Sequence, residues 1–553
     1  MMQSEKLRIV IYRYKRFVLG VTVIILVLLF VPSIHSVNAQ DPVVSKGSNG
    51  FAPYRPPGEG LAGTTVGGYM CARGKRQVPW SEYAPYCVPR WSGNNGGATS
   101  SGVTGRTITV TVDIANNGGL CTFLAKSGSK SIASTAVFKH NINTYVGLFN
   151  KDFELWGRKV VVKYFNGQGC YVSELLGQDQ SQAEADAQTA ASLGAFADIS
   201  EVSSTAPYDT ALAQHHVIAI GGEFMPHSWY QQNAPYEYSY YESCSKFVQS
   251  TIDVVKSAFN GLPAIYAAGK GIHDAPARIG LVYPNAPVIR ACAADLTGGL
   301  QAAHVPVAAT FVYSMANFGS VMQEATAAMA NFRSKRVTTV VCACDPLTPS
   351  FLADAAAAQH YYPEWLAMSV SDETMIRGIM SSPQDKAEWA HALTTMVQPT
   401  PARDQEFTVA YKLATGHELS NPPAIGDAGT VYQGILLLFS ALQQAGPDLT
   451  PATFQKGMWS LPASVQDAGM GGWSFGPGHY TTPSNFQVLY WSNDARGPIT
   501  GEQGAFVACN HGAFYLYYKK VPGLPVGRQL ECFGRGGSTV PWAPPATAIP
   551  SVP

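Results

Sequence analysis

The chain has 553 residues, which is too long for one ordinary hydrophobic core, so two or more domains are expected. Hydrophobic residues make up 46% of the sequence and charged residues 13%, and this balance excludes disorder over most of its length. Lysine plus arginine and aspartate plus glutamate both number 37, so the formal net charge is zero. A nucleic-acid-binding protein would normally carry a basic excess, and that class is therefore disfavoured.

An uncharged apolar run at residues 17–34 follows a basic stretch near the N-terminus. Val37 and Ala39 come shortly after it in the small-x-small pattern of a cleavage site, which predicts a secretory signal peptide over residues 1–39. The alternative is an uncleaved membrane anchor, because the run is about the minimum length that spans a bilayer. On either interpretation the rest of the chain is extracytoplasmic (secreted, periplasmic or at the cell envelope) and is associated with a membrane at most through this segment.

All ten cysteines lie beyond residue 39, and an even number in an exported chain favours disulfides. Proximity and loop context favour the pairs 71–87, 121–170 and 509–532. Cys342 and Cys344 lie in an apolar segment that is interpreted as a buried strand. A metal or redox site is disfavoured there, because no C-x-x-C spacing and no nearby histidine completes a zinc set.

Residues 40–105 are rich in glycine, proline, serine and asparagine and lack sustained periodicity. This composition is typical of a linker or a loosely folded collar, which a bridge between Cys71 and Cys87 would close.

From residue 106 onward, expected strands alternate with expected helices. In a first run, strands at 106–114, 158–165, 197–202 and 216–222 alternate with helices at 131–150, 179–193 and 203–215. Thr205 is the expected N-cap of the third helix, with Pro207 in its first turn. In a second run, strands at 277–284, 305–314, 336–346 and 365–371 alternate with helices at 288–304, 320–334 and 350–361. This pattern predicts an α/β protein with two Rossmann-like lobes, each built on a parallel sheet.

The C-terminal part contains two further expected helices, at 430–446 and 450–461, followed by short strands and turns. The predicted organisation is therefore lobe 1 at 106–262, with return segments from about 373–447, and lobe 2 at 263–372, with return segments from about 448–515. Residues 516–553 form a C-terminal extension whose tail, 533–553, is expected to be disordered because it is rich in proline, serine and alanine.

The motifs of common enzymes are missing from the sequence. It contains no phosphate-loop consensus, no G-x-S-x-G, no H-E-x-x-H and no dinucleotide fingerprint after the first strand. A non-enzymatic function, without cofactor or metal, is therefore favoured.

Ligands of open parallel sheets bind beyond the carboxyl ends of the strands, and two facing lobes form a cleft there. Helix N-terminal amides and hydroxyl groups suit a carboxylate, whereas an acidic side chain suits an ammonium group. The alternative is that the hydroxyl and acidic residues only cap helices and bind no ligand. The aromatic stretch 229–241 either lines the cleft or covers lobe 1. The candidate ligand-binding residues at the strand ends are Ser203, Ser204, Thr205, Gly221, Gly222, Glu223, Tyr283, Asp345, Asp372 and Glu373.

In order and spacing, several segments resemble the substrate-binding proteins of branched-chain amino-acid-type ABC importers, a type I periplasmic-binding protein-like family. The segments, within about 106–510, are ITVTV, NINTYVGLFN, LWGRKVVVKYFNGQG, DQSQAEADAQTAASL, VTTVVCACDPLTPSFLADAAAAQHYYPEWLAMS and DAGTVYQGILLLFSALQQAG. The resemblance implies a three-segment hinge and ligand-driven closure of the lobes.

The resemblance also implies roles for individual residues. Ser203 and Ser204, with the loop at Gly221 and Gly222, would bind a ligand carboxylate. Asp372 or Glu373 would bind an ammonium group, and Asp345 occupies the family's other second-lobe contact position.

The sequence thus predicts a solute-binding protein that captures a small polar metabolite, amino-acid or amide-like, and delivers it to an ABC transporter permease. A membrane-anchored sensor with the same two lobes is the first alternative, and a secreted hydrolase is the second.

Overall fold

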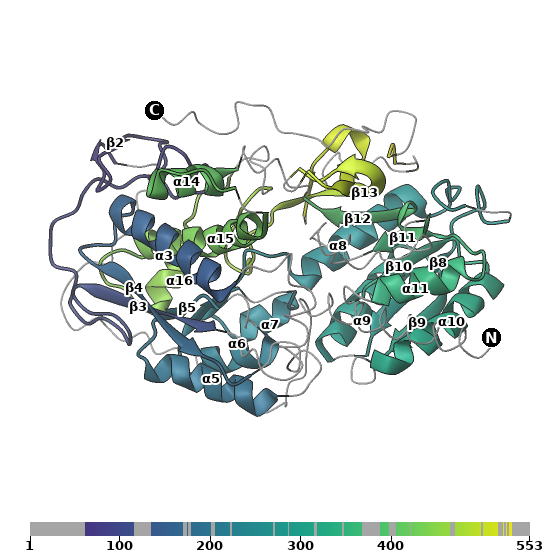
Figure 1. The fold of residues 1–553 in the computed structure, drawn as a ribbon, viewed down its shortest axis with the longest axis horizontal. Helices are drawn as coiled ribbons and strands as arrows, with labels where there is room; N and C mark the ends of the chain where they lie inside the picture. Colours follow the sequence, from purple (N-terminus) through teal and green to yellow (C-terminus); the bar gives the residue numbers. More distant parts are fainter. Residues whose placement is uncertain are drawn as a thin grey trace, which may run out of the picture.

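A computed structural model describes most of the chain from residue 61 onward. The described ranges are 61–114, 134–169, 174, 179–200, 205–221, 224–268, 271–285, 287–314, 318–344, 348–367, 387–397, 405–420, 422–464, 471–498, 501–517, 524, 527 and 530–532. Two lobes lie side by side and are joined near the middle of the molecule (Figure 1). The predicted fold class, two α/β lobes on parallel sheets, is confirmed.

Lobe 1 is built on a five-stranded parallel sheet in the order β4-β3-β5-β6-β7. Its longest pair is β3 (Thr107–Ile114) and β4 (Lys159–Asn166), which stay in register from Thr107 opposite Lys159 to Ile114 opposite Asn166. The run of β-branched residues in TITVTVDI, broken only by Asp113, favours this extended pair. The remaining strands are short: β5 (Ala197–Asp198), β6 (Ile218–Ile220) and β7 (Glu237–Tyr238).

Helices from both ends of the chain cover the sheet of lobe 1. Three come from the C-terminal half, and the long, largely apolar α15 packs along α3 and carries α16 (Figure 1). The helices are α3 (Thr135–Asp152), α5 (Gln180–Ser192), α6 (Ala206–Gln214), α7 (His227–Gln232), α14 (Glu406–Thr415), α15 (Pro422–Ala445) and α16 (Pro451–Trp459).

Lobe 2 contains an eight-stranded sheet in which β14-β13-β12-β11-β10-β8-β9 are neighbours and β15 pairs with β13. Strands β8 to β12 run parallel, whereas β13, β14 and β15 are antiparallel additions, so the sheet is mixed rather than purely parallel. The strands are β8 (Ile279–Pro284), β9 (Val307–Tyr313), β10 (Thr339–Cys342), β11 (Glu364–Ala367), β12 (Ala392–Met396), β13 (Asn485–Arg496), β14 (Gln503–Ala508) and β15 (Tyr515–Leu516).

In the described part of lobe 2, four helices flank this second sheet. They are α8 (Cys244–Val254), which continues into a π-helical turn (Val255–Phe259), α9 (Pro287–Ala302), α10 (Phe318–Ser334) and α11 (Thr348–Ala357). None of the helices in the described ranges is both long and apolar enough to cross a membrane. The apolar run at 17–34 lies outside those ranges.

The borders between the lobes differ from those expected. Helix α8, expected in lobe 1, packs on α9 of lobe 2, and β12, expected among the return segments of lobe 1, joins the sheet of lobe 2. Helix α16, expected in lobe 2, packs against α15 in lobe 1. In each case a long-range contact decides which lobe holds the element, and local sequence patterns do not encode such contacts.

Three crossovers connect the lobes: residues 239–243, 397–405 and 480–484, called crossovers 1, 2 and 3. Crossovers 1 and 3 form a parallel bridge between Ser239 and Thr481. The Ser239 amide donates to the Tyr480 carbonyl (3.0 Å), and the Thr482 amide donates to the Ser239 carbonyl (2.9 Å). Most of crossover 2, residues 398–404, lies outside the described ranges.

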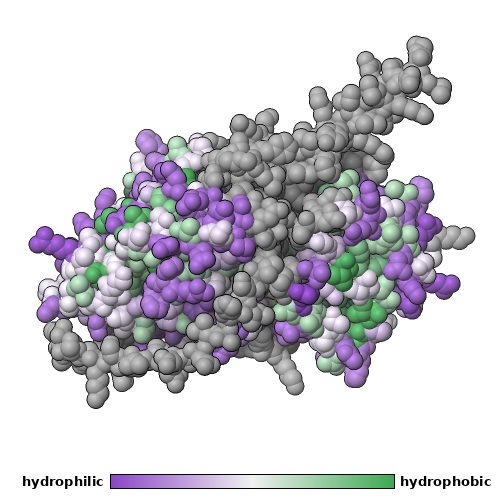
Figure 2. Space-filling view, turned by 90° about the horizontal axis from the view of Figure 1, so that it is seen from below, coloured by the Kyte–Doolittle hydropathy of each residue, from purple (hydrophilic) through white to green (hydrophobic). Residues whose placement is uncertain are grey.

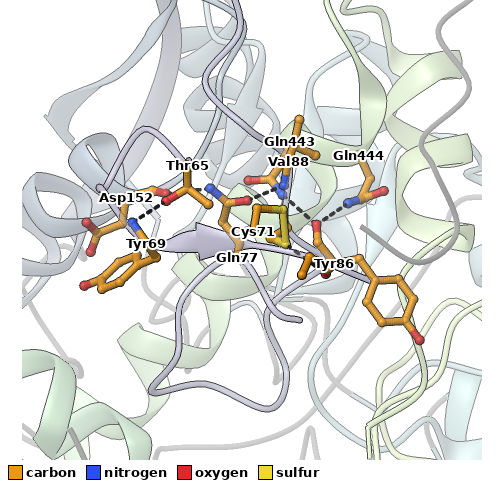
Figure 3. The surroundings of a disulfide bond; sticks show 11 residues. Thr65, Tyr69, Cys71, Gln77, Tyr86, Val88, Asp152, Gln443 and Gln444 are labelled. Carbon is orange, nitrogen blue, oxygen red and sulfur yellow. Dashed lines mark hydrogen bonds between the residues drawn. A yellow bond between two sulfur atoms is a disulfide. The ribbon is translucent and has the colours of Figure 1, made fainter. Parts of the chain in front are cut away.

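Residues 61–105 form a packed collar rather than a linker, at the end of lobe 1 that is remote from lobe 2 (Figure 1). Its Trp80 ring is 1% exposed and stacks on Phe149 of α3, with ring centroids 5.8 Å apart. Gln77, fully buried, accepts from the Val88 amide and donates to the Asp152 carbonyl, both at 2.8 Å (Figure 3). For these residues the expectation of a loose segment was wrong, because Trp80 and Gln77 are buried against residues far away in the sequence. Residues 40–60 of the predicted segment lie outside the described ranges.

Four disulfides lie within the described residues. Cys71–Cys87 and Cys509–Cys532 confirm two predicted pairs. Cys244–Cys292, which joins α8 to α9, was not predicted. Cys342 and Cys344 are buried as expected but are bonded to each other. The predicted pair 121–170 lies outside the described residues.

Figure 2 shows hydrophilic residues over the visible face of both lobes, interrupted by small apolar areas. Among the described residues, the exposed large apolar side chains are Leu61, Met70, Val161, Val312, Met322 and Leu413. Scattered apolar residues of this kind are usual on a water-exposed surface.

Replacing Gln77 with alanine is expected to destabilise lobe 1 by about 2–4 kcal/mol, because a buried amide and a buried carbonyl each lose their partner. Thermal unfolding followed by calorimetry measures this as a lower transition temperature for lobe 1. Gln231→Ala, at an exposed position on α7, is the matched control and should change stability by less than about 0.5 kcal/mol. Equal transition temperatures for Gln77→Ala and wild type would contradict the packed collar.

Candidate functional site

The crossovers place the carboxyl edges of the two sheets at the joint between the lobes. Strand β7 ends at Tyr238 and enters crossover 1 at once, and β12 ends at Met396 and enters crossover 2. Strand β7 is parallel to β6, and β12 is parallel to β11, so the carboxyl ends of β6 and β11 lie at the same edges. The structure therefore turns the predicted ligand-binding edge of each lobe toward the other lobe.

Two aromatic residues bridge the lobes at this joint. Tyr283, near the carboxyl end of β8 in lobe 2, is half-buried and packs against the apolar cores of both lobes. Phe224, just after β6 in lobe 1, does the same, and its ring centroid lies 5.9 Å from that of Phe247 in α8. Tyr283 thus lies where a residue contacting an interlobe ligand would be.

Phe224 was missed by the sequence analysis, which stopped at Glu223. Its φ of 53° places a non-glycine aromatic residue in the left-handed region. The available signal was the sequence Gly221-Gly222-Glu223-Phe224, in which a large apolar side chain follows directly on a glycine turn at a strand end. A loop of this type commonly carries binding residues.

Of the ten predicted site residues, the structure describes Thr205, Gly221 and Tyr283. The others lie outside the described ranges: Ser203, Ser204, Gly222, Glu223, Asp345, Asp372 and Glu373.

Thr205 has the capping role that was the alternative to ligand binding. It is 1% exposed, and its hydroxyl accepts from the Tyr208 amide at the start of α6 (3.3 Å). The same hydroxyl donates to Glu174 (2.5 Å). Gly221 is also buried, and its amide donates to the Tyr238 carbonyl (2.9 Å), which extends the pairing of β6 with β7.

Buried carboxyl and hydroxyl groups brace the carboxyl edge of lobe 1. Asp198 accepts from the Thr111 hydroxyl (2.6 Å) and from the Ser200 amide (2.8 Å). The Ser200 hydroxyl in turn accepts from the Asp113 amide (2.6 Å). Burial raises the pKa of Asp198 to about 6, although these hydrogen bonds partly oppose the shift. Burial likewise raises the pKa of Glu174 to about 7. These hydrogen bonds fix the backbone at Ser200, just after β5, and the hydrogen-bond partners of Asp198 named above carry no positive charge.

The aromatic stretch 229–241 contributes mainly to packing. Tyr230 and Tyr238 are buried, and Tyr230 stacks on Tyr480 of crossover 3 (6.2 Å between centroids). Tyr240 lines a small apolar pocket with Ile199, Ile220 and Ile435, at the carboxyl ends of β5 and β6. The stretch therefore covers lobe 1 and one crossover, and Tyr240 is the residue that reaches a strand-end pocket.

The described residues contain no group of three or more histidine, cysteine, aspartate or glutamate side chains arranged to hold a metal ion. What the joint offers is two facing sheet edges, aromatic side chains between them and a hydrogen-bonded loop scaffold. Such a joint can enclose a small molecule by movement of the lobes.

The fold and the joint define a two-lobed protein with the type I periplasmic-binding fold. The family model described as periplasmic binding protein matches residues 127–496, more than half of the chain. The chain therefore belongs to the periplasmic binding protein family, as the resemblance implied, a family of extracytoplasmic, non-enzymatic binding proteins. Among curated proteins, none matches this sequence.

Solved structures show the same fold at low sequence identity. A fatty acid ABC transporter substrate-binding protein from Thermomonospora curvata is 13% identical over 79% of this chain and 100% of its own, with a TM-score of 0.50. A leucine-, isoleucine-, valine-, threonine- and alanine-binding protein from Brucella ovis, in a closed conformation, is 11% identical over 75% and 97% (TM-score 0.51). A substrate-binding protein of an ABC transporter from Aeropyrum pernix is 11% identical over 75% and 97% (TM-score 0.52).

The raised pKa of Asp198 makes stability depend on pH. Its folded pKa of about 6 lies above the ordinary value near 4, so its stabilising contribution is present at pH 4 and is lost as the pH rises to about 6. Asp198→Asn should remove about 2 kcal/mol of this dependence between pH 4.5 and pH 7, measured as the free energy of unfolding in urea. Glu418→Asn, at an exposed position, should leave the dependence unchanged. An unaltered pH dependence in Asp198→Asn would show that this carboxyl titrates normally.

Proposed function

We propose that the protein is an extracytoplasmic solute-binding protein that captures a small polar metabolite between its lobes and delivers it to an ABC importer. The observation that supports this most directly is that Phe224 and Tyr283, from opposite lobes, both pack against the two cores at the facing carboxyl edges. A ligand held at that joint would contact both lobes and would stabilise their closed arrangement.

The ligand we favour is an amino acid or an amide-like molecule. Ser203, Ser204 and the loop at Gly221 and Gly222 follow β5 and β6, where hydroxyls and backbone amides suit a carboxylate. In lobe 2, Asp345 follows β10, and Asp372 and Glu373 follow β11, where a carboxylate suits an ammonium group. Tyr283 and Phe224 would pack on the apolar part of the ligand.

A thermal-shift screen with the full exported chain tests this proposal. The panel contains amino acids, amides, short peptides and fatty acids, because the similar structures are named for amino acids and a fatty acid. A ligand that binds only the folded state stabilises it, by about 2.7 kcal/mol when its concentration is a hundred times Kd, and so raises the transition temperature. If no compound shifts the transition and small-angle scattering shows no closure, solute binding is contradicted.

With a ligand from that screen, Tyr283→Ala and Phe224→Ala should each weaken binding at least about tenfold in calorimetric titration, because each removes an aromatic wall contributed by one lobe. Tyr164→Ala is the matched control, since Tyr164 is also half-buried but lies on the edge strand β4. Its Kd should equal that of the wild type. Unchanged affinity in both Tyr283→Ala and Phe224→Ala would move the ligand away from this joint.

We also propose that residues 1–39 are removed during export. Mass spectrometry of the exported protein should then find Gln40 at the N-terminus. A retained segment at residues 17–34 would contradict this and would favour the membrane-anchored sensor.

A further inference from the structure

A buried lysine at the start of α8 binds the backbone of crossover 3. Lys246, in the first turn of α8, is 4% exposed. Its Nζ donates to the carbonyls of Thr481 (2.7 Å) and Pro483 (2.5 Å) in crossover 3. The side chain thus runs from the end of crossover 1 to the backbone of crossover 3, directly beside the Ser239–Thr481 bridge.

The helix that carries Lys246 is firmly attached to lobe 2. The Cys244–Cys292 disulfide ties its first residue to α9, and the Ser243 side chain caps it by accepting from the Lys246 amide (3.2 Å). The carbonyls of Thr481 and Pro483, by contrast, belong to the segment that links the lobes. The lysine therefore fastens crossover 3 to a rigid element of lobe 2.

The position of Lys246 is unfavourable for a positive charge. It is removed from water, and it lies at the positive end of the α8 dipole. Burial lowers the pKa of Lys246 to about 7, and Glu242 opposes this shift. Four other titratable groups face the lysine: Glu242 in crossover 1, Tyr517 after β15, His227 in α7 and His479 before crossover 3.

Burial shifts the pKa of the acidic neighbour upward and the pKa of the two histidines downward. Glu242 accepts a hydrogen bond from the Tyr517 hydroxyl, and burial raises the pKa of Glu242 to about 7. Burial, reinforced by the lysine charge, lowers the pKa of His227 and of His479 below its ordinary value. Since the Lys246 amine itself makes the bonds to crossover 3, loss of its proton directly weakens them.

We propose that Lys246 is a pH-sensitive clamp of the hinge, which fastens crossover 3 to the start of α8, next to crossover 1, when protonated and loosens this attachment when it loses its proton. Protonated, the amine makes two charge-assisted hydrogen bonds, which are about twice as strong as neutral ones. Deprotonated, it keeps only neutral N–H donors. The clamp acts on the joint between the lobes and does not depend on which ligand binds.

Hydrogen exchange measured on the full, ligand-free chain tests the clamp. The Ser239 and Thr482 amides, which pair the crossovers, report its state. After correction for intrinsic exchange, their protection should fall about tenfold or more between pH 6 and pH 8, relative to the amides of β3. Protection that is constant over this range overturns the proposal.

Variants assign the effect to the lysine. Lys246→Met should show low protection at both pH values and no step, whereas Lys256→Met, at an exposed position in the π-helical turn after α8, should keep the wild-type step. A step retained in Lys246→Met overturns the proposal. If that variant fails to fold, Glu242→Gln serves instead: without the carboxylate the lysine loses its proton more readily, so the step should move to lower pH. A step that stays in place in Glu242→Gln also overturns the proposal.

The test separates this inference from the proposed function. Failure of the ligand screen leaves the exchange measurement intact, because no ligand is present in it. If the exchange experiment contradicts the clamp, the proposed solute binding still stands, because closure of the lobes requires the crossovers but does not require Lys246 to titrate.

Discussion

The backbone pairing of crossovers 1 and 3 is the constraint on which the rest of the structure depends. The reciprocal bonds of Ser239 with Tyr480 and Thr482 hold two separate sheets at a common joint. Since crossovers 1 and 2 leave the carboxyl ends of β7 and β12, the carboxyl edges of both sheets must face that joint. The positions of Phe224 and Tyr283 between the cores follow from this connection.

Buried titratable side chains in both lobes have similar kinds of hydrogen-bond partner. Buried acids accept from neutral donors, as Glu364 does from Thr339 and Glu406 from Tyr432. Buried cations donate to backbone carbonyls: Lys246 to crossover 3, and Arg158 to the collar and the segment between α15 and α16. The Lys412–Glu418 ion pair, by contrast, lies at the surface. Burial raises the pKa of Glu364 to about 8 and that of Glu406 to about 7, which makes these groups sensitive to pH near neutrality.

Local patterns predicted much of the fold. The run of β-branched residues predicted strand β3, and the caps at Thr205 and Thr450 predicted the starts of α6 and α16. The short β12 and β14 were missed, because five or six residues such as QGAFVA carry little periodicity. The collar was misjudged because its order comes from distant partners, such as Gln77 with Asp152. Of the candidate site residues, Tyr283 lies at the joint, whereas Thr205 caps a helix. The rule that ligands bind beyond the carboxyl ends of strands identifies an edge of a sheet, but it does not distinguish a residue that contacts a ligand from one that caps a helix.

The distance between the lobes, measured with and without ligand, tests the central claim most directly. Spin labels at Glu184 on α5 and Lys335 just after α10, both exposed, would report it by pulsed electron paramagnetic resonance. With a compound that raises the transition temperature, the distance distribution should narrow and shorten, because the ligand is held between the facing edges. A distribution that such a compound leaves unchanged would contradict an interlobe binding site.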